Sequence, residues 1–254
     1  MDSLSLKKLL DEAWLKYEVS SFVEKDPISI PHRFKKKQDI EVSAFLTSII
    51  SWGNRKAILK SASLLMELLE NTPYNFVINA SDSECERLKT FYYRTLNGND
   101  MFYILKALKQ VYMEGGFEVF FKQEYAEQPL IERIAKFYNF YKQFLPERTK
   151  RHVASIDGGS AGKRSNMFLR WMVRSSERGV DFGLWSCISP SELFLPLDVH
   201  VANIARDLSL TKRKQNDRKT VEEVTDALCT FCPEDPIKYD FALFSLDLNS
   251  HVLA

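Results

Sequence analysis

The chain has 254 residues, of which 45% are hydrophobic and 27% are charged. This composition is typical of a soluble globular protein with a sizeable core. Its 35 basic residues almost balance its 34 acidic ones, so the net charge of the chain does not indicate a nucleic-acid or membrane partner. Any such partner must bind through local patches of charge.

The beginning of the chain, MDSLSLKKLLDEAWLKY, predicts an amphipathic helix because acids and lysines interrupt its apolar positions. It lacks the uninterrupted apolar region of a signal peptide, and longer apolar runs such as SAFLTSIISW are too short to span a bilayer. Four cysteines are few for this length, which suits a reducing compartment and argues against a disulfide framework. We therefore expect an intracellular protein, located in the cytoplasm, without membrane contact.

Helical periodicity dominates the rest of the chain, whereas alternating strand patterns and hairpin turns are scarce. The predicted helices cover residues 4–18, 40–52, 55–71, 82–92, 100–113, 117–123, 129–145, 163–175, 199–208, 219–231 and 235–248. Loops are predicted at residues 27–38, 72–82, 145–162, 175–197 and 211–219. The sequence therefore predicts an all-α fold.

Three of these loops carry basic clusters, RFKKK at 33–37, RTKRH at 148–152 and TKRKQNDRK at 211–219. A basic loop is most often solvated surface. If the fold brings the three together, they would form a face for phosphate contacts. The sequence leaves both interpretations open.

A glycine-rich turn in SIDGGSAGKRSNMFLRWMVR, residues 155–174, runs directly into a predicted helix. Gly158, Gly159 and Gly162 permit a tight or left-handed backbone, and helix N-terminal amides bind anions, so the turn is a candidate phosphate cradle. Lys163 stands in the first helical turn, where the dipole and any burial disfavour the charged ammonium. Lys163 is therefore either a surface residue or, beside a carboxylate, a candidate amine nucleophile.

A second stretch, LPLDVHVANIARDLSL at residues 195–210, opens another predicted helix with a carboxylate. Apolar residues recur with helical spacing from Val201 onward, which places Asp198 at or next to the N-cap. The simplest role for Asp198 is to accept from free backbone amides. A carboxylate that acts with Lys163 in catalysis would need the same position at the helix start, so the capping role and a chemical role are both open.

These two stretches resemble the helix-hairpin-helix (HhH-GPD) DNA glycosylase superfamily, and PLDVHVANIARDL is similar to the pattern of eukaryotic 8-oxoguanine glycosylases. The resemblance covers residues 155–250 and, more weakly, 40–70; over its whole length the chain also resembles a bacterial family of hypothetical proteins. It implies two helical lobes with a cleft between them, one containing roughly residues 30–145 and the other roughly 146–254 plus the N-terminal helix.

The resemblance also implies an activity, DNA base-excision repair on duplex DNA that contains a damaged base. The damaged base would be an oxidised purine such as 8-oxoguanine. Lys163 would attack the sugar and form a Schiff base, giving a glycosylase that is also an AP lyase. Asp198 would stabilise the positive charge that develops on the sugar. The protein would be bacterial and monomeric, and it would associate with the nucleoid when it binds DNA.

Further positions acquire roles through the same resemblance. The expected DNA contacts are Gly159, Gly162, Arg164 and His200 around the two helix starts, and Trp52 and Asn54 as candidate wedges for the space of the extruded base. The expected base pocket consists of Phe244, Asp240, Trp185 and Phe182. Each has a simpler interpretation: core packing for the aromatic residues and helix capping for the asparagine. An aspartate at position 240, where the family has an amide, keeps acceptors but loses a donor.

The chain also departs from the glycosylase pattern. Lys163 and Asp198 are 35 positions apart, a longer interval than in endonuclease III and similar to that of archaeal 8-oxoguanine glycosylases. Ala161 stands where the family repeats a glycine. The iron–sulfur cysteine run is missing, and Cys229 and Cys232 form one CxxC without the second pair that a zinc site needs. We expect no cofactor, apart from a possible monovalent cation at the hairpin.

Two other classes of function remain open at the level of sequence. The chain could be a non-catalytic DNA-binding protein that retains the glycosylase fold, which the imperfect hairpin and near-neutral charge favour. It could also be a helical protein-interaction domain, which would show no salt-dependent binding to duplex DNA.

Overall fold

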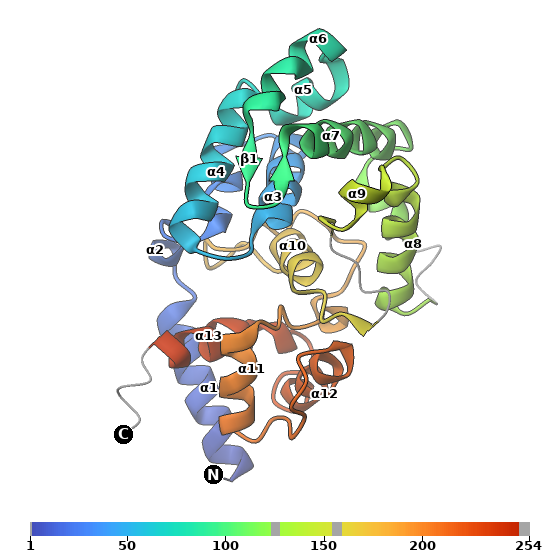
Figure 1. Ribbon diagram of the computed structural model, residues 1–254. Helices are drawn as coiled ribbons and strands as arrows, with labels where there is room; N and C mark the ends of the chain where they lie inside the picture. Colours follow the sequence, from blue (N-terminus) through green and yellow to red (C-terminus); the bar gives the residue numbers. More distant parts are fainter. Residues whose placement is uncertain (1, 123–127, 154–158, 249–254) are drawn as a thin grey trace. The chain divides into compact units, whose positions relative to one another are not determined.

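The computed structural model describes residues 2–122, 128–153 and 159–248 and confirms the all-α prediction (Figure 1). Within these ranges the only sheet is an antiparallel pair of two-residue strands, β1 (Tyr92–Tyr93) and β2 (Leu96–Asn97). No helix in the same ranges combines the length and the apolar character needed to cross a membrane. The chain divides into two compact units: unit 1 contains Met1–Glu24 and Ser155–Ala254, and unit 2 contains Lys25–Ala154.

Unit 2 is built from seven described α-helices and the short hairpin. The helices are α3 (Lys37–Ile50), α4 (Arg55–Leu68), α5 (Pro73–Asn79), α6 (Asp82–Cys85), α7 (Gly98–Met113), α8 (Leu130–Lys142) and α9 (Glu147–Lys150). The described residues of this unit also include four 3-10 helices, at Pro27–Ser29, Pro31–Arg33, Glu86–Thr90 and Phe117–Phe120.

The core of unit 2 is organised around α3, in which every residue from Ile40 to Ile50 is buried. Phe45 lies in an aromatic cluster, with ring centroids 5.2 Å from Phe117, 5.9 Å from Phe137 and 5.4 Å from Tyr141. Edge-to-face contacts of this kind add to the hydrophobic burial of the rings. Because α3 is buried on all sides from Ile40 to Ile50, it is the scaffold on which the rest of unit 2 packs.

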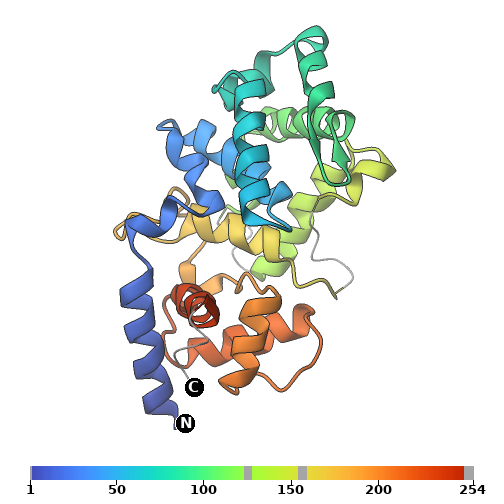
Figure 2. The same cartoon turned by 60° about the vertical axis from the view of Figure 1, so that its left-hand side comes forward.

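Unit 1 is built from helices at both ends of the sequence. They are α1 (Ser3–Tyr17), α2 (Ser20–Val23), α10 (Lys163–Val173), α11 (Val199–Asp207), α12 (Arg218–Cys229) and α13 (Asp240–Leu248), with 3-10 helices at Pro190–Glu192 and Pro236–Tyr239. Helix α13 packs against both α1 and α11, and Figure 2 shows α1 and α13 side by side from a second direction. Leu10, Ala202, Ala205 and Phe241 are almost completely buried. Because α1 packs against α13 and buries Leu10, the N-terminal helix belongs to the core of unit 1.

Two predicted loops contain whole α-helices, and the predicted helix at 117–123 is instead a 3-10 helix at Phe117–Phe120. Residues 72–82 were expected to form a loop, but Pro73–Asn79 is helix α5, whose side chains at Phe76 and Val77 are buried. Proline at the first helical position favours a helix start, and burial of the two apolar side chains stabilises a helix too short to form alone. Residues 145–162 were also expected to be a loop, and they contain the single turn α9.

The predicted helix at residues 82–92 is also wrong in its second half. Helix α6 ends at Cys85 and a 3-10 helix continues to Thr90, after which the chain enters the β hairpin. Arg94, at the turn of this hairpin, has φ 55°, a left-handed conformation that is uncommon for residues other than glycine. This turn contains no glycine, which is why the hairpin was not predicted from the sequence.

Candidate functional site

Lys163 and Asp198 meet in unit 1 although 35 positions separate them in the sequence. The Lys163 Nζ lies 3.2 Å from Asp198 Oδ2, and the two side chains are 37% and 21% exposed. Lys163 is the first residue of α10, and Asp198 immediately precedes α11. The structure therefore brings together an amine and a carboxylate, each at the N-terminal end of a helix, in a position that solvent can reach.

Asp198 is the N-cap of α11. Its Oδ1 accepts from the backbone amide of Val201 at 3.0 Å, and its backbone is extended, with φ −110° and ψ −174°. This is the usual geometry of a capping aspartate. Because Oδ1 caps the helix while Oδ2 faces Lys163, the capping role and a chemical role are compatible.

The turn before α10 adopts the backbone that its glycines permit. Gly162, the N-cap of α10, is left-handed with φ 59° and ψ 25°, and its amide donates to Ser160 Oγ at 3.3 Å. Gly159 has φ 86°, and a Cβ added there would meet nothing within 4 Å. Gly158 and the rest of the expected hairpin at 154–158 lie outside the described residues. A side chain at position 159 would therefore face open space.

Asn166 ties the two helix starts together. Its Nδ2 donates to the carbonyl oxygen of Ala161 at 3.2 Å and to that of Leu195 at 3.4 Å. Ala161 lies in the turn before Lys163, and Leu195 lies three residues before Asp198. Asn166 is 4% exposed, so these bonds are protected from water. Sequence reasoning missed this residue, because the first four residues of α10, KRSN, are all polar and do not indicate which of them is buried.

A third charged residue, Asp240, stands at the start of α13. It is buried, and Arg170 forms an ion pair with it. Burial raises the pKa of the Asp240 carboxyl to about 6, because desolvation outweighs the attraction of Arg170, and the Asp198 carboxylate raises this pKa further while Lys163 lowers it. Asp240 is therefore in electrostatic contact with the Lys163–Asp198 pair.

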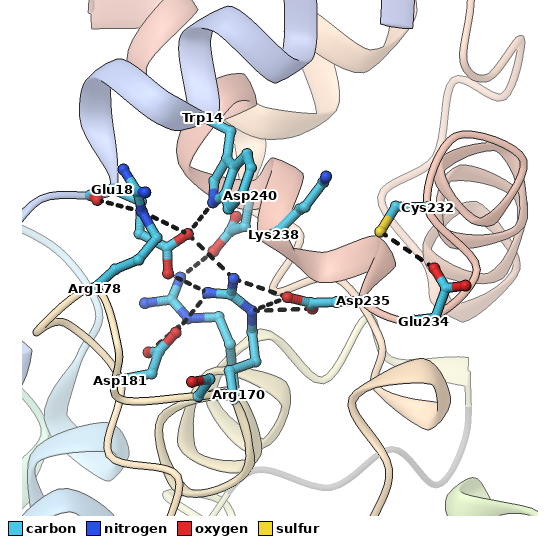
Figure 3. A network of polar contacts seen from close by, with 12 residues as sticks. Trp14, Glu18, Arg170, Arg178, Asp181, Cys232, Glu234, Asp235, Lys238 and Asp240 are labelled. Carbon is cyan, nitrogen blue, oxygen red and sulfur yellow. Dashed lines mark hydrogen bonds and ion pairs between the residues drawn. The ribbon is translucent and has the colours of Figure 1, made fainter.

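Arg170 and its helical neighbour Arg174 anchor a buried ionic network, which Figure 3 shows from close by. Arg174 contacts Glu18 at 2.8 Å, Asp181 at 2.7 Å and Asp235 at 3.0 Å. Arg170 adds a contact of 3.3 Å to Asp181. The network thus links α10 to the segment after it, to the residue that follows α1 and to the segment before α13.

The network holds its charges because each has a partner. Burial alone would lower the pKa of the Arg174 guanidinium, but Asp181, Glu18 and Asp235 more than offset this and raise it. Burial raises the pKa of the Asp181 carboxyl despite the two nearby guanidinium groups. Phe241 lies beneath both guanidinium groups, with its ring centroid 4.4 Å from Arg170 Cζ and 5.7 Å from Arg174 Cζ. Such cation–π contacts supply attraction without further charge.

The four residues expected to line a base pocket differ in burial and in their partners. Trp185 is 2% exposed and packs edge-to-face on Phe168 at 5.4 Å, so it is a core residue of the segment after α10. Phe182 and Phe244 are half-buried, and Phe244 has its ring 6.3 Å from that of Phe22. Asp240 is engaged by Arg170, which occupies an acceptor that would otherwise be available to a base edge. Of the four, Phe182 and Phe244 retain partly exposed rings.

The expected DNA contacts beside the pair lie in the first turns of two helices. Arg164 follows Lys163 in α10 and is half-buried. His200 is exposed in the first turn of α11, next to Val199, which is 61% exposed. Both positions flank the amine and the carboxylate.

Trp52 and Asn54 belong to unit 2, in the turn between α3 and α4. Asn54 is the N-cap of α4, where its Oδ1 accepts from the amide of Ala57 at 3.2 Å. The half-buried Trp52 ring is covered by Arg94, whose Cζ lies 4.5 Å from the ring centroid, and meets the edge of Tyr93 at 5.7 Å. Sequence reasoning missed the covering arginine because the hairpin that carries it was not predicted.

A search of the described residues found no group of three or more histidine, cysteine, aspartate or glutamate side chains that could hold a metal ion. Cys229 and Cys232 are half-buried free thiols. The expected cation position at the hairpin falls partly on residues 154–158, outside the described ranges.

Fold and site together define a mainly helical protein with an amine and a carboxylate paired at two helix starts. A family model described as "Protein of unknown function (DUF2400)" matches residues 26–249, and the chain belongs to this family. Searches of curated proteins and of solved structures found no match.

Proposed function

We propose that this protein is a DNA base-excision glycosylase with AP-lyase activity, acting on an oxidised purine such as 8-oxoguanine. The observation that carries the proposal is the distance of 3.2 Å between Lys163 Nζ and Asp198 Oδ2. An amine nucleophile needs a neighbouring group that accepts its proton, and Asp198 Oδ2 is at hydrogen-bond distance. The resemblance of both stretches to helix-hairpin-helix glycosylases gives the substrate class.

In the first step, the neutral amine form of Lys163 uses its Nζ lone pair to form a bond to the sugar C1′, and Asp198 accepts the proton that the resulting secondary ammonium releases after the base has left. The bond between C1′ and the base breaks, and the base leaves with the bonding electrons and takes up a proton. Positive charge develops on the sugar as this bond breaks, and the ionised Asp198 stabilises it. Extrusion of the nucleotide costs a few kcal/mol, less for a damaged base than for a paired normal one.

In the second step, the sugar ring opens and the lysine nitrogen becomes a Schiff base at C1′. A proton leaves C2′, the C3′–O bond breaks, and the 3′ phosphate departs with its electron pair, which nicks the strand. Water then hydrolyses the imine and restores Lys163. These two steps balance in atoms and electrons without a cofactor, because every bond change uses only the amine, water and protons.

The test is reductive trapping. The protein is incubated with duplexes that contain 8-oxoguanine or an abasic site, and borohydride reduces any imine to a stable secondary amine. We expect a covalent protein–DNA adduct with the wild-type chain, and no adduct with Lys163→Gln. Lys8→Gln is the matched control, since Lys8 is an exposed lysine of unit 1 with only a distant partner, Glu12 at 3.9 Å.

The other outcomes separate the alternatives. If the folded wild-type protein binds duplex DNA but forms no adduct on either substrate, it is a non-catalytic DNA-binding protein. If Lys163→Gln is trapped as well as wild type, another amine is the nucleophile and the assignment of Lys163 is wrong. If there is no salt-dependent binding at all, the chain is a protein-interaction domain.

A further inference from the structure

The loop between α11 and α12 is held in place by side chains. At the end of α11, Arg206 donates to the carbonyl oxygens of Arg213 at 2.7 Å, Lys214 at 3.0 Å and Gln215 at 3.3 Å. The same guanidinium also donates to the side-chain oxygen of Asn216. One arginine thereby fixes four consecutive residues, which its planar group of five donors allows.

The end of the loop is fixed by a second set of bonds. Thr220 Oγ1 donates to the carbonyl of Gln215 at 2.7 Å, and Arg213 donates to Asp217 Oδ2 at 2.7 Å and to Thr220 Oγ1 at 3.1 Å. Asp217 is in turn the N-cap of α12, accepting from the amide of Thr220 at 3.0 Å. Two arginines, Arg206 of α11 and Arg213 of the loop, therefore order the backbone of this loop.

The lysines of this segment are used differently. Lys212, Lys214 and Lys219 are exposed, and among the described residues no carboxylate forms an ion pair with any of their ammonium groups. Of the acids near these lysines, Asp217 is paired with Arg213 and Glu222 with Arg218 at 2.9 Å, while Glu223 accepts from the backbone amide of Lys212 at 3.4 Å. The loop thus presents positive charge to solvent on an ordered backbone.

This basic loop adjoins the glycine turn of the candidate site. Ser160 and Asp217 form an isolated antiparallel β-bridge, which places the turn at 159–162 directly beside the end of the loop. Gly159, next to the bridge, borders open space. A chain of phosphates that reached the turn before Lys163 would therefore also come close to the loop.

We propose that the segment Lys212–Lys219 is a second phosphate-contact surface for duplex DNA, continuous with the turn at 159–162 through the Ser160–Asp217 bridge. The inference rests on the proposed function, which supplies DNA as the partner. It assigns the α11–α12 loop a role in binding the backbone of the damaged strand on one side of the lesion. Arg206 is the positioning residue of this surface.

Two physical arguments support the assignment. Lysine ammonium groups that neutralise phosphates release condensed counterions, which favours binding at physiological salt. A backbone already fixed by Arg206 and Thr220 loses little conformational entropy when DNA binds, so more of the contact energy appears as affinity.

The experiment compares the salt dependence of binding to a labelled duplex that carries a stable abasic-site analogue. The test variant is Lys212→Gln/Lys214→Gln, and the matched control is Lys8→Gln/Lys16→Gln, which removes the same charge from exposed positions of α1. The slope of log K against log salt is expected to fall by about 2 in the test variant, with affinity lowered at least about tenfold, and to stay unchanged in the control.

A third variant tests the positioning role. Arg206→Lys keeps the positive charge, but the lysine ammonium cannot donate to all four residues that the guanidinium contacts. Weaker DNA binding by this variant, in a protein that remains folded, would support a positioning role for Arg206. Equal slopes for wild type, test variant and control would overturn the inference while leaving the glycosylase proposal intact. Absence of DNA binding by the wild-type chain would overturn both, which distinguishes the two failures.

Discussion

Asp198 offers Lys163 only one of its two carboxylate oxygens, because the other oxygen caps α11. Oδ2 lies 3.2 Å from Lys163 Nζ, and Oδ1 accepts from the Val201 amide at 3.0 Å. The cap holds the carboxylate in a single orientation, so the amine always meets the same oxygen. A residue that stabilises a helix thereby also fixes the geometry of the candidate nucleophile and its proton acceptor.

Replacing Asp198 by asparagine separates these two roles. Asparagine caps helices as well as aspartate, so the free energy of unfolding is expected to change by less than about 1 kcal/mol in urea titrations. The neutral amide can neither accept the lysine proton nor stabilise the charged sugar, so the rate of borohydride trapping should fall at least about a hundredfold. Asp2→Asn, at the N-cap of α1, is the matched control for the capping change. A variant with normal trapping would mean that Asp198 only caps.

Asn166 is expected to matter more for activity than for stability. Asn166→Ala leaves the carbonyls of Ala161 and Leu195 without their donor and frees the two helix starts to shift relative to each other. A displacement of about 1 Å between reacting groups is enough to reduce a rate on the order of a hundredfold. A time course of borohydride trapping measures the rate of adduct formation, and thermal unfolding measures the stability. A rate loss no larger than the loss of folded protein would assign Asn166 to packing alone.

Much of the fold could be predicted because its helices carry strong local signals. Helix α7 begins with a capping box formed by Asn97 and Asp100, and α11 begins with Asp198, so pattern and capping agree at these starts. Helix α5 has only seven residues and owes its stability to the burial of Phe76 and Val77, which no local pattern reveals. The β hairpin turns at Arg94 without the glycine that usually announces such a turn.

The candidate site could be predicted only in part, for a related reason. Lys163 and Asp198 stand at recognisable helix starts, so a sequence motif can find each of them. Arg170 and Arg174 sit within the run FLRWMVR, and an arginine inside an apolar run is a sign of a buried ionic partner. The identity of the partners is a tertiary property, since Glu18 lies 156 positions from Arg174.

Asp240 should make stability depend on pH in a defined window. The folded state holds its pKa at about 6, above the usual 3.8, so between about pH 4 and pH 6 the folded chain keeps a proton that the unfolded chain has released. The corresponding stabilisation is fully present below about pH 4 and is lost as the pH rises through 6. The asparagine of Asp240→Asn does not titrate, so the free energy of unfolding of this variant lacks the pH dependence that comes from residue 240.

The measurement is the difference in unfolding free energy between wild type and Asp240→Asn across this range. We expect wild type to lose on the order of 2–3 kcal/mol relative to the variant between about pH 4 and pH 7. Asp181, whose pKa is also raised by burial, is present in both proteins and cancels in the difference to first order. A difference that does not change with pH would show that Asp240 titrates at its ordinary value.

The largest loss of stability is expected when Arg174 is replaced by methionine. Methionine fills much of the volume, but Glu18, Asp181 and Asp235 then face one another without the shared guanidinium. Removing one partner from a buried ionic group costs about 3–5 kcal/mol, because the remaining charges are desolvated and unpaired. The exposed pair of Arg218 with Glu222 gives the comparison, since Arg218→Met should cost less than about 1 kcal/mol.

Urea unfolding of the Arg174→Met variant at two pH values tests the mechanism of this loss. Without Arg174 the buried carboxyls favour their protonated forms, so the folded state of the variant takes up protons that the unfolded state releases. The variant should therefore recover part of its stability as the pH falls from about 7 to about 5, whereas the Arg218→Met protein should follow wild type. Equal destabilisation at both pH values would attribute the loss to packing around Phe241, whose ring both guanidinium groups cover.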